Sequence, residues 1–537
     1  MRVGFSRDSL RSLKGKMGIL DRFRKRSKSG KRSWPDFYPG TRIPRGSTGS
    51  GFNGAVQDRL TDDFRGSELS ADASLLGSLD KLRARSRQLW MSNPYASRFV
   101  QMVVGNVLGR DGIRMEAQVL REDGTLDEKD SLDLEAMWGR WSRPEYCSMN
   151  GRLSFLDIQK LALSTMARDG EVLIRVHNPA DSEFGFALQV IECDKLLTGA
   201  NKTLDGGNRL NMSIEQDAYG RPIAYWLADV PIGGEYISAN PATVKTIRVP
   251  AEEIVHLYLF ERPEQSRGIP WMAQSMRGLH MTESYREAEL VAARVAASKM
   301  AFYTSSDGQG YTGDDITQDG SLVFEAEAGL IEQLPAGMDL QTLDWSHPNS
   351  NVGDFVKSCL RGVSSGLNIS YNALSNDLEG VNFSSIRAGV QEERETWKSL
   401  QSFMIGHLIQ PIFDKWLARV ILEGAVPFPP RKIDKFKSVV WRPRGFSYVD
   451  PAKDNQAFAK AVQLGVMSRT EIAASQGKDF KETLATLAQE ERLAYEAGVN
   501  ISPRQTMPIY PAMVDPEQAS GPDAETDDQI AAEDIAE

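Results

Sequence analysis

The chain has few of the residues on which disulfide scaffolds and metal centres depend. Its 537 residues include only three cysteines, Cys147, Cys193 and Cys359, which are far apart and odd in number. A disulfide framework or a cysteine zinc cluster is therefore not expected, and a reducing compartment fits this composition. The five histidines are also scattered, so we expect surface or core roles for them and neither a metal nor a cofactor.

Several motifs of enzymes are missing as well. The sequence contains no GxxxxGK[ST] phosphate loop and no HExxH pair, which argues against an ATP motor or a zinc hydrolase. The Asp- and Gly-rich run at 307–315 lacks the ligand spacing and closing glutamate of an EF-hand. We therefore expect a chain that is not an enzyme.

One catalytic pattern does occur and leaves an alternative open. Residues 362–366 read GVSSG, which matches the GxSxG pattern of serine hydrolases with Ser364 as the nucleophile. Such a serine must lie on a sharp turn between a strand and a helix. Here the segment ends an amphipathic helix and only His407 follows it, so the hydrolase is the weaker reading.

No uninterrupted apolar run is long enough to cross a bilayer. The most apolar-looking stretch, AELVAARVAASKMAFY at 288–303, contains Glu289, Arg294 and Lys299. Charges at such spacing are too costly inside a membrane, so no membrane partner is expected.

Charge is distributed unevenly along the chain. Residues 1–32 carry twelve Lys or Arg and two Asp or Glu, and because the whole chain carries −10, the rest carries −20. Residues 515–537 hold nine acidic residues and no basic one. We predict a flexible basic arm over 1–65 and a disordered acidic tail over 500–537. The arm could bind nucleic acid, bind a scaffold or simply keep the chain soluble.

Between these ends the composition is that of a folded protein with a core. It is 41% apolar and 25% charged, and the length allows roughly two to four domains. Helical periodicity covers 79–108, with Asn93 as a predicted N-cap before Pro94, and then 132–143. A helix capped by Ser154 and closed by Gly170 precedes the strand patterns, which lie at 171–178, 186–196, 222–229, 246–250 and 253–260. We predict one α+β domain over 66–269.

From Pro270 the helical period returns. We predict a long alanine-rich helix over 270–303 with Pro270 in its first turn, and a second helix over 349–369. The segment between them, 304–348, is Gly-rich and acidic and contains two short strand patterns. It is predicted to be a small exposed module.

A polar loop at 370–382 then leads into the clearest amphipathic helix. One face of that helix comprises Ile386, Val390, Trp397, Leu400, Met404, Leu408 and Ile412. Pro411 should kink or restart the helix. A short β segment at 436–450 closes the region 383–450, and a helical hairpin is predicted over 451–499.

The loop and its neighbours supply the candidate site residues. Lys357 and Arg361 lie four apart on the second helix, where they could face a polyanion or, as we favour, pair with acids. Ser384 should help to cap the next helix, and Arg387 should pair with a nearby acid or carbonyl. The loop itself offers polar side chains with little positive charge: Asn372, Ser375, Asn376, Asp377, Glu379 and Asn382.

The order of these parts resembles the lambda-type family of tailed-phage portal proteins. Five stretches carry the resemblance, in sequence order and spanning about 75–495: NPYASRFVQMVVGNVLGRDGIRM, ERPEQSRGIPWMAQSM, AELVAARVAASKMAFY, GLNISYNALSNDLEGVNFSSIRAG and LGVMSRTEIAASQGKDFKE. The basic arm and the acidic tail fall outside the resemblance.

The resemblance implies a portal fold and a place for each part. The α+β region 66–269 would be most of the wing, the helices 270–303 and 349–369 the stem, and 304–348 the clip. Residues 370–382 would form the tunnel loop, 383–450 would cross the wing, and 451–499 would form the crown. Channel-facing candidates on the stem are Lys357, Arg361, Arg294 and Lys299.

The resemblance also implies a function. Copies of the chain would form a dodecameric ring at one capsid vertex, through which double-stranded DNA passes without sequence recognition during packaging and ejection. Partners would be the terminase large subunit, the major capsid protein and scaffold, and later the head-completion or adaptor proteins. The protein would be a virion component assembled in the host bacterial cytoplasm. A prophage or gene-transfer-agent portal with the same role is the alternative.

Overall fold

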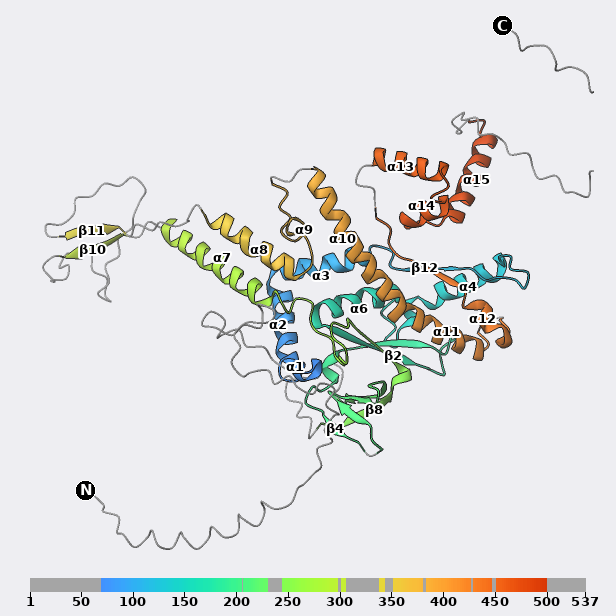
Figure 1. Ribbon diagram of the computed structural model, residues 1–537, viewed down its shortest axis with the longest axis horizontal. Helices are drawn as coiled ribbons and strands as arrows, with labels where there is room; N and C mark the ends of the chain where they lie inside the picture. Colours follow the sequence, from blue (N-terminus) through green and yellow to red (C-terminus); the bar gives the residue numbers. More distant parts are fainter. Residues whose placement is uncertain are drawn as a thin grey trace, which may run out of the picture. The chain divides into compact units, whose positions relative to one another are not determined.

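The computed structural model describes residues 69–204, 206–229, 244–297, 301–305, 338–342, 351–379, 383–425, 428–446 and 451–499. Within these ranges the chain is a mixture of helices and antiparallel sheets, as predicted (Figure 1). The arm at 1–65, the tail at 500–537, Lys299, Asn382 and most of 304–348 lie outside the described residues. What we expect of them stays a prediction.

The first part of the described chain is mostly helical, with one short strand between its third and fourth helices. Its elements are α1 (Ala71–Leu75), α2 (Leu79–Ser92), α3 (Pro94–Val107), β1 (Arg114–Ala117), α4 (Glu128–Trp141), α5 (Pro144–Cys147) and α6 (Phe155–Asp169). The predicted caps are confirmed. The side chain of Asn93 accepts hydrogen bonds from two backbone N–H groups of α3, and Ser154 forms a capping box with Asp157. Gly170 closes α6 in the left-handed conformation, with φ of 92°.

Two antiparallel sheets follow, and the five predicted strands are present in them. One has the order β3-β2-β9 and the other β4-β5-β6-β7-β8. Their bounds are β2 Glu171–His177, β3 Ala187–Ile191, β4 Lys202–Thr203, β5 Arg209–Asn211, β6 Ile214–Gln216, β7 Pro222–Ala228, β8 Thr246–Pro250 and β9 Ile254–Tyr258. The sequence did not reveal β4, β5 and β6, because strands of two or three residues are too short to show an alternating pattern.

The core is built around a cluster of aromatic rings. Trp138 of α4 lies within 6 Å, between ring centroids, of Trp141, Phe155, Phe413 and Trp416. These side chains come from three helices, the last of them more than 200 residues after the other two, and all are buried. Such clusters bury large apolar areas and therefore fix how α4, α6 and α11 (Gln410–Leu422) pack together.

The long helix after the polar loop is interrupted just before Pro411. It consists of α10 (Phe383–Met404), a π-helical turn η6 (Ile405–Ile409) and α11. Proline has no N–H to donate to the carbonyl four residues earlier, so the wide turn and restart have a local cause. Most of the predicted face is buried: Trp397, Met404, Leu408 and Ile412 are at most 3% exposed, while Val390 and Leu400 are half-buried.

The predicted helix over 270–303 is shorter than expected. The helix α7 runs over Met276–Ala297, and residues 301–305 form strand β10 (Ala301–Ser305), paired with β11 (Met338–Thr342). Pro270 is thus outside the helix. The reason is tertiary: the segment around Pro270 is tied to other elements, since the N–H of Gly268 donates to the Glu171 side chain (2.7 Å) and the N–H of Trp271 donates to the carbonyl of Ala167 on α6 (3.2 Å).

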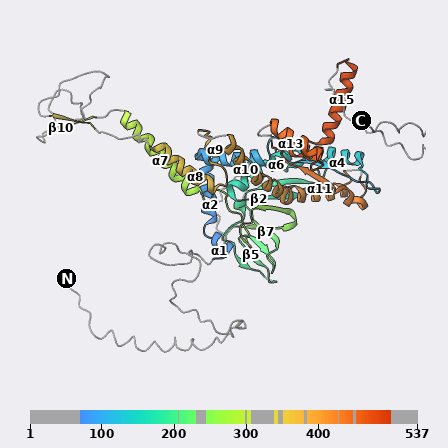
Figure 2. The same cartoon turned by 45° about the horizontal axis from the view of Figure 1, so that its top comes forward.

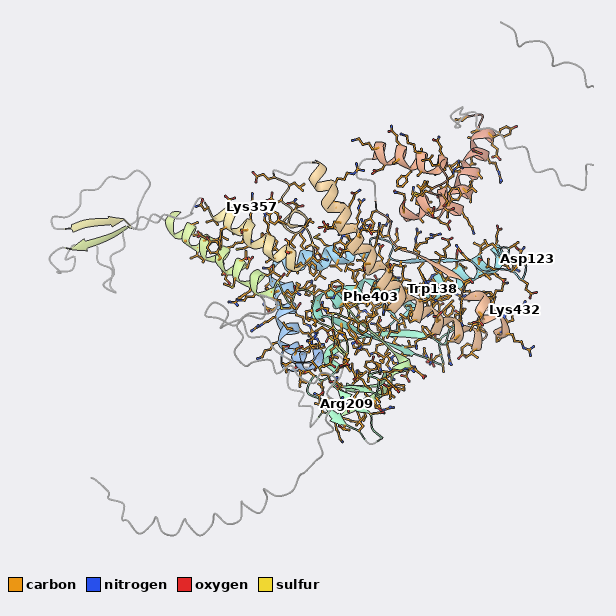
Figure 3. All side chains as sticks on the ribbon, in the orientation of Figure 1. Asp123, Trp138, Arg209, Lys357, Phe403 and Lys432 are labelled. Carbon is orange, nitrogen blue, oxygen red and sulfur yellow. The ribbon has the colours of Figure 1, made fainter. Side chains whose placement is uncertain are left out.

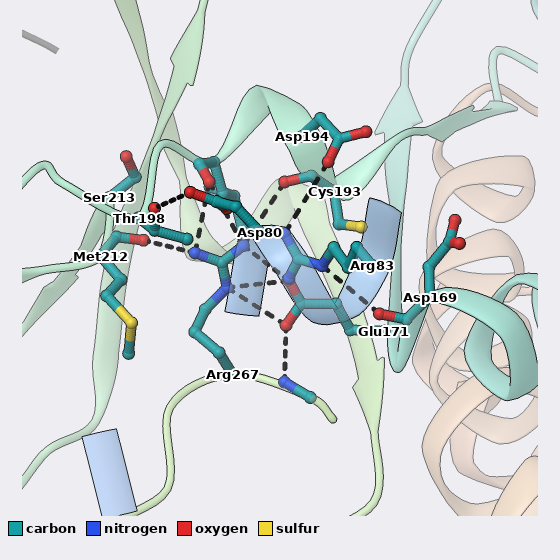
Figure 4. A network of polar contacts seen from close by, with 12 residues as sticks. Asp80, Arg83, Asp169, Glu171, Cys193, Asp194, Thr198, Met212, Ser213 and Arg267 are labelled. Carbon is teal, nitrogen blue, oxygen red and sulfur yellow. Dashed lines mark hydrogen bonds and ion pairs between the residues drawn. The ribbon is translucent and has the colours of Figure 1, made fainter. Parts of the chain in front are cut away.

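Glu171 is the centre of a buried ionic network (Figure 4). Its carboxylate is fully buried and contacts Arg83 of α2, and it accepts from Nε of Arg267 (2.8 Å) and from Nε2 of His256 (3.1 Å). Burial alone would raise the pKa of Glu171, but Arg267 and Arg83 outweigh it and hold this pKa well below its ordinary value. Burial lowers the pKa of His256, whose neutral ring must donate because a carboxylate only accepts.

We expect Glu171→Gln to lower the free energy of unfolding by about 3–5 kcal/mol, because it leaves the buried guanidinium of Arg267 without its counter-charge and removes the nearer of the two carboxylates that contact Arg83. Urea denaturation measures this. The surface variant Glu145→Gln is the control and should change stability by no more than about 0.5 kcal/mol. Since the folded pKa of Glu171 lies below the unfolded one, its contribution exists above the unfolded pKa and is lost as pH falls through the folded value. Equal stability of the two variants would contradict this role for the network.

The C-terminal region contains three helices and not the predicted hairpin. After α12 (Ile433–Phe436) and β12 (Val439–Arg442), which pairs with β1, come α13 (Pro451–Gln463), α14 (Arg469–Ser475) and α15 (Phe480–Glu496). The sequence did not show that α14 and α15 are separate helices, because the break between them, at residues 476–479, is short. Gly445 packs directly on the turn after α14, where a Cβ atom would stand 2.0 Å from the carbonyl carbon of Gln476. The close approach requires glycine.

Gly445→Ala should therefore displace the turn after α14 and loosen the α13–α15 segment. We expect faster protease cleavage within 451–499 and a lower melting temperature, measured by limited proteolysis and thermal unfolding. Gly389→Ala is the matched control, because a Cβ there would meet nothing within 4 Å. Unchanged cleavage of the Gly445 variant would show that the turn accommodates a side chain.

Candidate functional site

Helices α7 and α8 (Val352–Gly366) form an antiparallel pair (Figures 1 and 2). At one end the hydroxyl of Ser275, just before α7, donates to the carbonyl of Val363 (2.9 Å). Further along, the rings of Tyr285 and Phe355 meet edge to face with centroids 5.1 Å apart. Gly278 lets the helices approach, since a Cβ there would lie 3.0 Å from Val363.

The polar loop after α8 is more ordered than expected. Its first part is a short helix, α9 (Tyr371–Ser375), in which Asn372 and Ser375 lie. Ser370 caps this helix by accepting from the N–H of Ala373 (3.3 Å). Asn376 ends it in the left-handed conformation, with φ of 58°, which asparagine tolerates better than most residues.

Two other helices hold α9 in place. The guanidinium of Arg98, on α3, donates from Nε to the carbonyl of Ala373 (2.8 Å). The backbone N–H of Ser370 donates to the carboxylate of Glu393, on α10. Neither partner was identified from the sequence, because these contacts join residues 275 and 23 positions apart.

Lys357 on α8, labelled in Figure 3, is paired with acids of this loop. Its Nζ lies 3.1 Å from Oε2 of Glu379 and 3.6 Å from Oδ2 of Asp377. The hydrogen bond with Glu379 and the charges of both carboxylates raise the pKa of Lys357. The interpretation favoured from the sequence, that the lysine pairs with acids, agrees with this contact.

Asp377 has further partners that fix its position. Its Oδ2 accepts from the hydroxyl of Tyr371 (2.8 Å), and its Oδ1 accepts from the N–H of Glu379 (3.0 Å). The Tyr371 hydrogen bond is the main reason why the pKa of Asp377 is lowered. Arg361, the other cation of α8, stacks over the ring of Tyr371 at 5.6 Å. Both α8 cations therefore contact the α9 segment.

The remaining candidates are dispersed. Arg294 is exposed in the last turn of α7, and Ser384 lies within the first turn of α10, which begins one residue earlier, so it is not the N-cap. Arg387 donates to Asp454 of α13 (2.8 Å), a contact of the structural type we expected. In the described ranges no helix is long and apolar enough to cross a membrane, and no group of His, Cys, Asp or Glu there is placed to hold a metal.

The geometry of Ser364 contradicts the hydrolase alternative. Ser364 lies inside α8, is 2% exposed, and its hydroxyl donates to the carbonyl of Leu360 (2.8 Å), one turn earlier. A nucleophile must stand on an exposed strand-to-helix turn, and this serine does not. The GxSxG match is a coincidence of helix composition.

Comparison with known proteins assigns the chain to a class. Residues 57–401 match the family model described as phage portal protein, lambda family. A probable portal protein of Halomonas phage phiHAP-1 is 34% identical over 490 residues, covering 90% of this chain and 94% of that protein. Portal protein B of Escherichia phage lambda is 21% identical, covering 84% of this chain and 90% of that protein.

These matches define a phage portal protein, a structural component of the virion. The chain belongs to the lambda family of phage portal proteins. Among solved structures, a chain in the neck of an empty gene-transfer-agent particle shares 13% identity and a TM-score of 0.44, covering 76% of this chain and 94% of that one. That likeness is too low to establish a common fold.

Ser364→Ala should leave the protein folded, with a change in unfolding free energy of about 1 kcal/mol or less, because the hydroxyl makes only one local hydrogen bond. Thermal unfolding measures this. A larger loss would mean that the hydroxyl supports the packing of α8 on its neighbours. Ser275→Ala, which removes a contact between separate segments, is the comparison and should cost more.

Proposed function

We propose that the chain assembles into a closed dodecameric ring at one capsid vertex and that double-stranded DNA passes through the ring during packaging and ejection. In this proposal α7 and α8 form the stem, residues 304–348 form the clip and the α13–α15 segment forms the crown. The terminase large subunit docks on the clip and supplies the packaging energy. Head-completion or adaptor proteins follow it there, while the wing meets the major capsid protein and scaffold.

Exposed apolar side chains on the helix pair support assembly. On α7, Met281, Leu290 and Val291 are 57%, 64% and 52% exposed, and on α8 Phe355 is 53% exposed. Apolar faces left uncovered on one subunit are typical of surfaces that another protein covers. A head-to-tail interface pairs two different patches of the subunit, and it generates a ring when its rotation closes.

The charge of the loop region supports a conduit for DNA. Each phosphate held by a cation adds affinity that must be broken for the DNA to move on. The described loop contains Asp377 and Glu379 and no Lys or Arg, and the adjoining cations of α8 are already engaged. A surface of this kind binds DNA phosphates weakly and therefore lets the DNA move past it.

A gene-transfer-agent portal would have the same role and differ only in the DNA that it admits. The named relatives with the matching sequences are proteins of phages, which favours a phage.

The experiment that tests the proposal is native mass spectrometry of the full-length 59.6 kDa chain, with negative-stain images of the same sample. A closed ring with a central hole is the expected result. A stable monomer or dimer, both alone and when co-expressed with capsid protein and scaffold, would overturn it.

Val291→Glu should reduce the ring fraction while leaving the subunit folded. The exposed site tolerates a charge in the monomer, but an interface would have to bury it without a partner. Native mass spectrometry gives the ring fraction and thermal unfolding reports on the fold. The control is Leu132→Glu on α4, where the side chain is 65% exposed. If both variants assemble like the wild type, this face of α7 is not an interface.

A further inference from the structure

Two acids of the polar loop, Asp377 and Glu379, contact Lys357 on α8, and this contact affects how the loop region can interact with DNA. Asp377 and Glu379 were expected to line a channel as polar contacts, and Lys357 was expected to be a channel-facing cation. The structure brings all three together: both carboxylates lie within 4 Å of Nζ. The lysine is one-third exposed, so the ion pair is at the surface and not part of the core.

We propose that Asp377 and Glu379 are counter-ions for Lys357, and that their role is to prevent this lysine from binding the phosphates of DNA. The inference rests on the proposed function as a DNA conduit. Within that function, Asp377 and Glu379 act on DNA through Lys357 and not by direct contact. Two carboxylates within 4 Å offset the single positive charge locally, and at physiological salt interactions are screened beyond about 8 Å. A passing phosphate therefore meets no net positive charge at this position.

The surrounding contacts suit a fixed counter-ion. Asp377 is held by the hydroxyl of Tyr371 and by the N–H of Glu379, and α9 is itself tied to α3 through Arg98. Holding the carboxylates in place matters because isolated surface ion pairs are weak and easily exchanged for other partners. A phosphate would have to displace Glu379 and also Asp377, whose carboxylate is already held by Tyr371 and by the N–H of Glu379.

The alternative is that the acids repel DNA directly and that Lys357 is incidental. The two readings differ in one respect. If the acids act through Lys357, their removal increases DNA binding only while the lysine is present. If they repel phosphates themselves, the increase occurs with or without it. A double-mutant cycle separates these cases.

The test measures binding of short double-stranded DNA of mixed sequence to the full-length protein by fluorescence anisotropy across a salt series. Asp377→Asn/Glu379→Gln should bind more tightly than wild type. Its plot of log affinity against log salt should steepen by roughly 0.9 for each phosphate that a freed lysine contacts. Adding Lys357→Gln should return both affinity and slope to wild-type values.

The matched control removes two acids that do not pair with a lysine among the described residues. Glu128 on α4 and Glu145 on α5 are exposed, so Glu128→Gln/Glu145→Gln changes the net charge equally without freeing a cation. This control should leave the salt slope nearly unchanged. If the Asp377 substitution disturbs α9, Glu379→Gln alone, at a side chain that is 81% exposed, keeps the test available.

Tighter binding that persists in the Lys357→Gln background would overturn the proposal, and so would unchanged binding in the acid variants. Failure of the conduit itself is recognised separately, because native mass spectrometry of the wild type would then show no ring. In that case the same cycle, measured on the monomer, still decides whether the acids act through Lys357.

Discussion

One buried carboxylate organises the described part of this protein. Glu171 begins a central strand and is removed from water, so its charge must be compensated within the protein. The compensating charges are those of Arg83 on α2 and Arg267 on the segment that enters α7, and the neutral ring of His256 on β9 adds a hydrogen bond. The network thereby joins the sheet to the start of the long helix pair.

This constraint also explains the geometry around the network. Gly170 and Gly268 lie so close together that a Cβ on Gly268 would stand 2.2 Å from the carbonyl oxygen of Gly170. The close approach allows the N–H of Gly268 to reach Glu171, and it delays the start of α7 until Met276.

The helix pair and the loop show a second use of charge compensation. In the core, pairing permits a carboxylate to be buried; at Lys357, pairing masks a cation that would otherwise attract phosphate. The proposed conduit requires that DNA touch the protein without being held. The same elementary interaction therefore serves stability in one place and passage in the other, and the difference lies in exposure to solvent.

The sequence by itself determined the features that local physics controls. Asn93 before Pro94, the Ser154 capping box and the break before Pro411 follow from contacts within a few residues, and all were predictable. Its resemblance to portal proteins was visible for a similar reason, because the motifs are continuous stretches. The GxSxG match at Ser364 shows the limit, since a pattern of residues does not specify a turn.

Only the tertiary structure decided which charges meet. The start of α7 depended on Glu171, 97 residues before Gly268, and the partners of Lys357 lie across the turn that contains α9. Side chains that are distant in sequence find each other through packing, and periodicity records which face is apolar but not what lies against it. For that reason the sequence identified the class of protein and most of its helices, while only the tertiary structure showed which charged side chains pair.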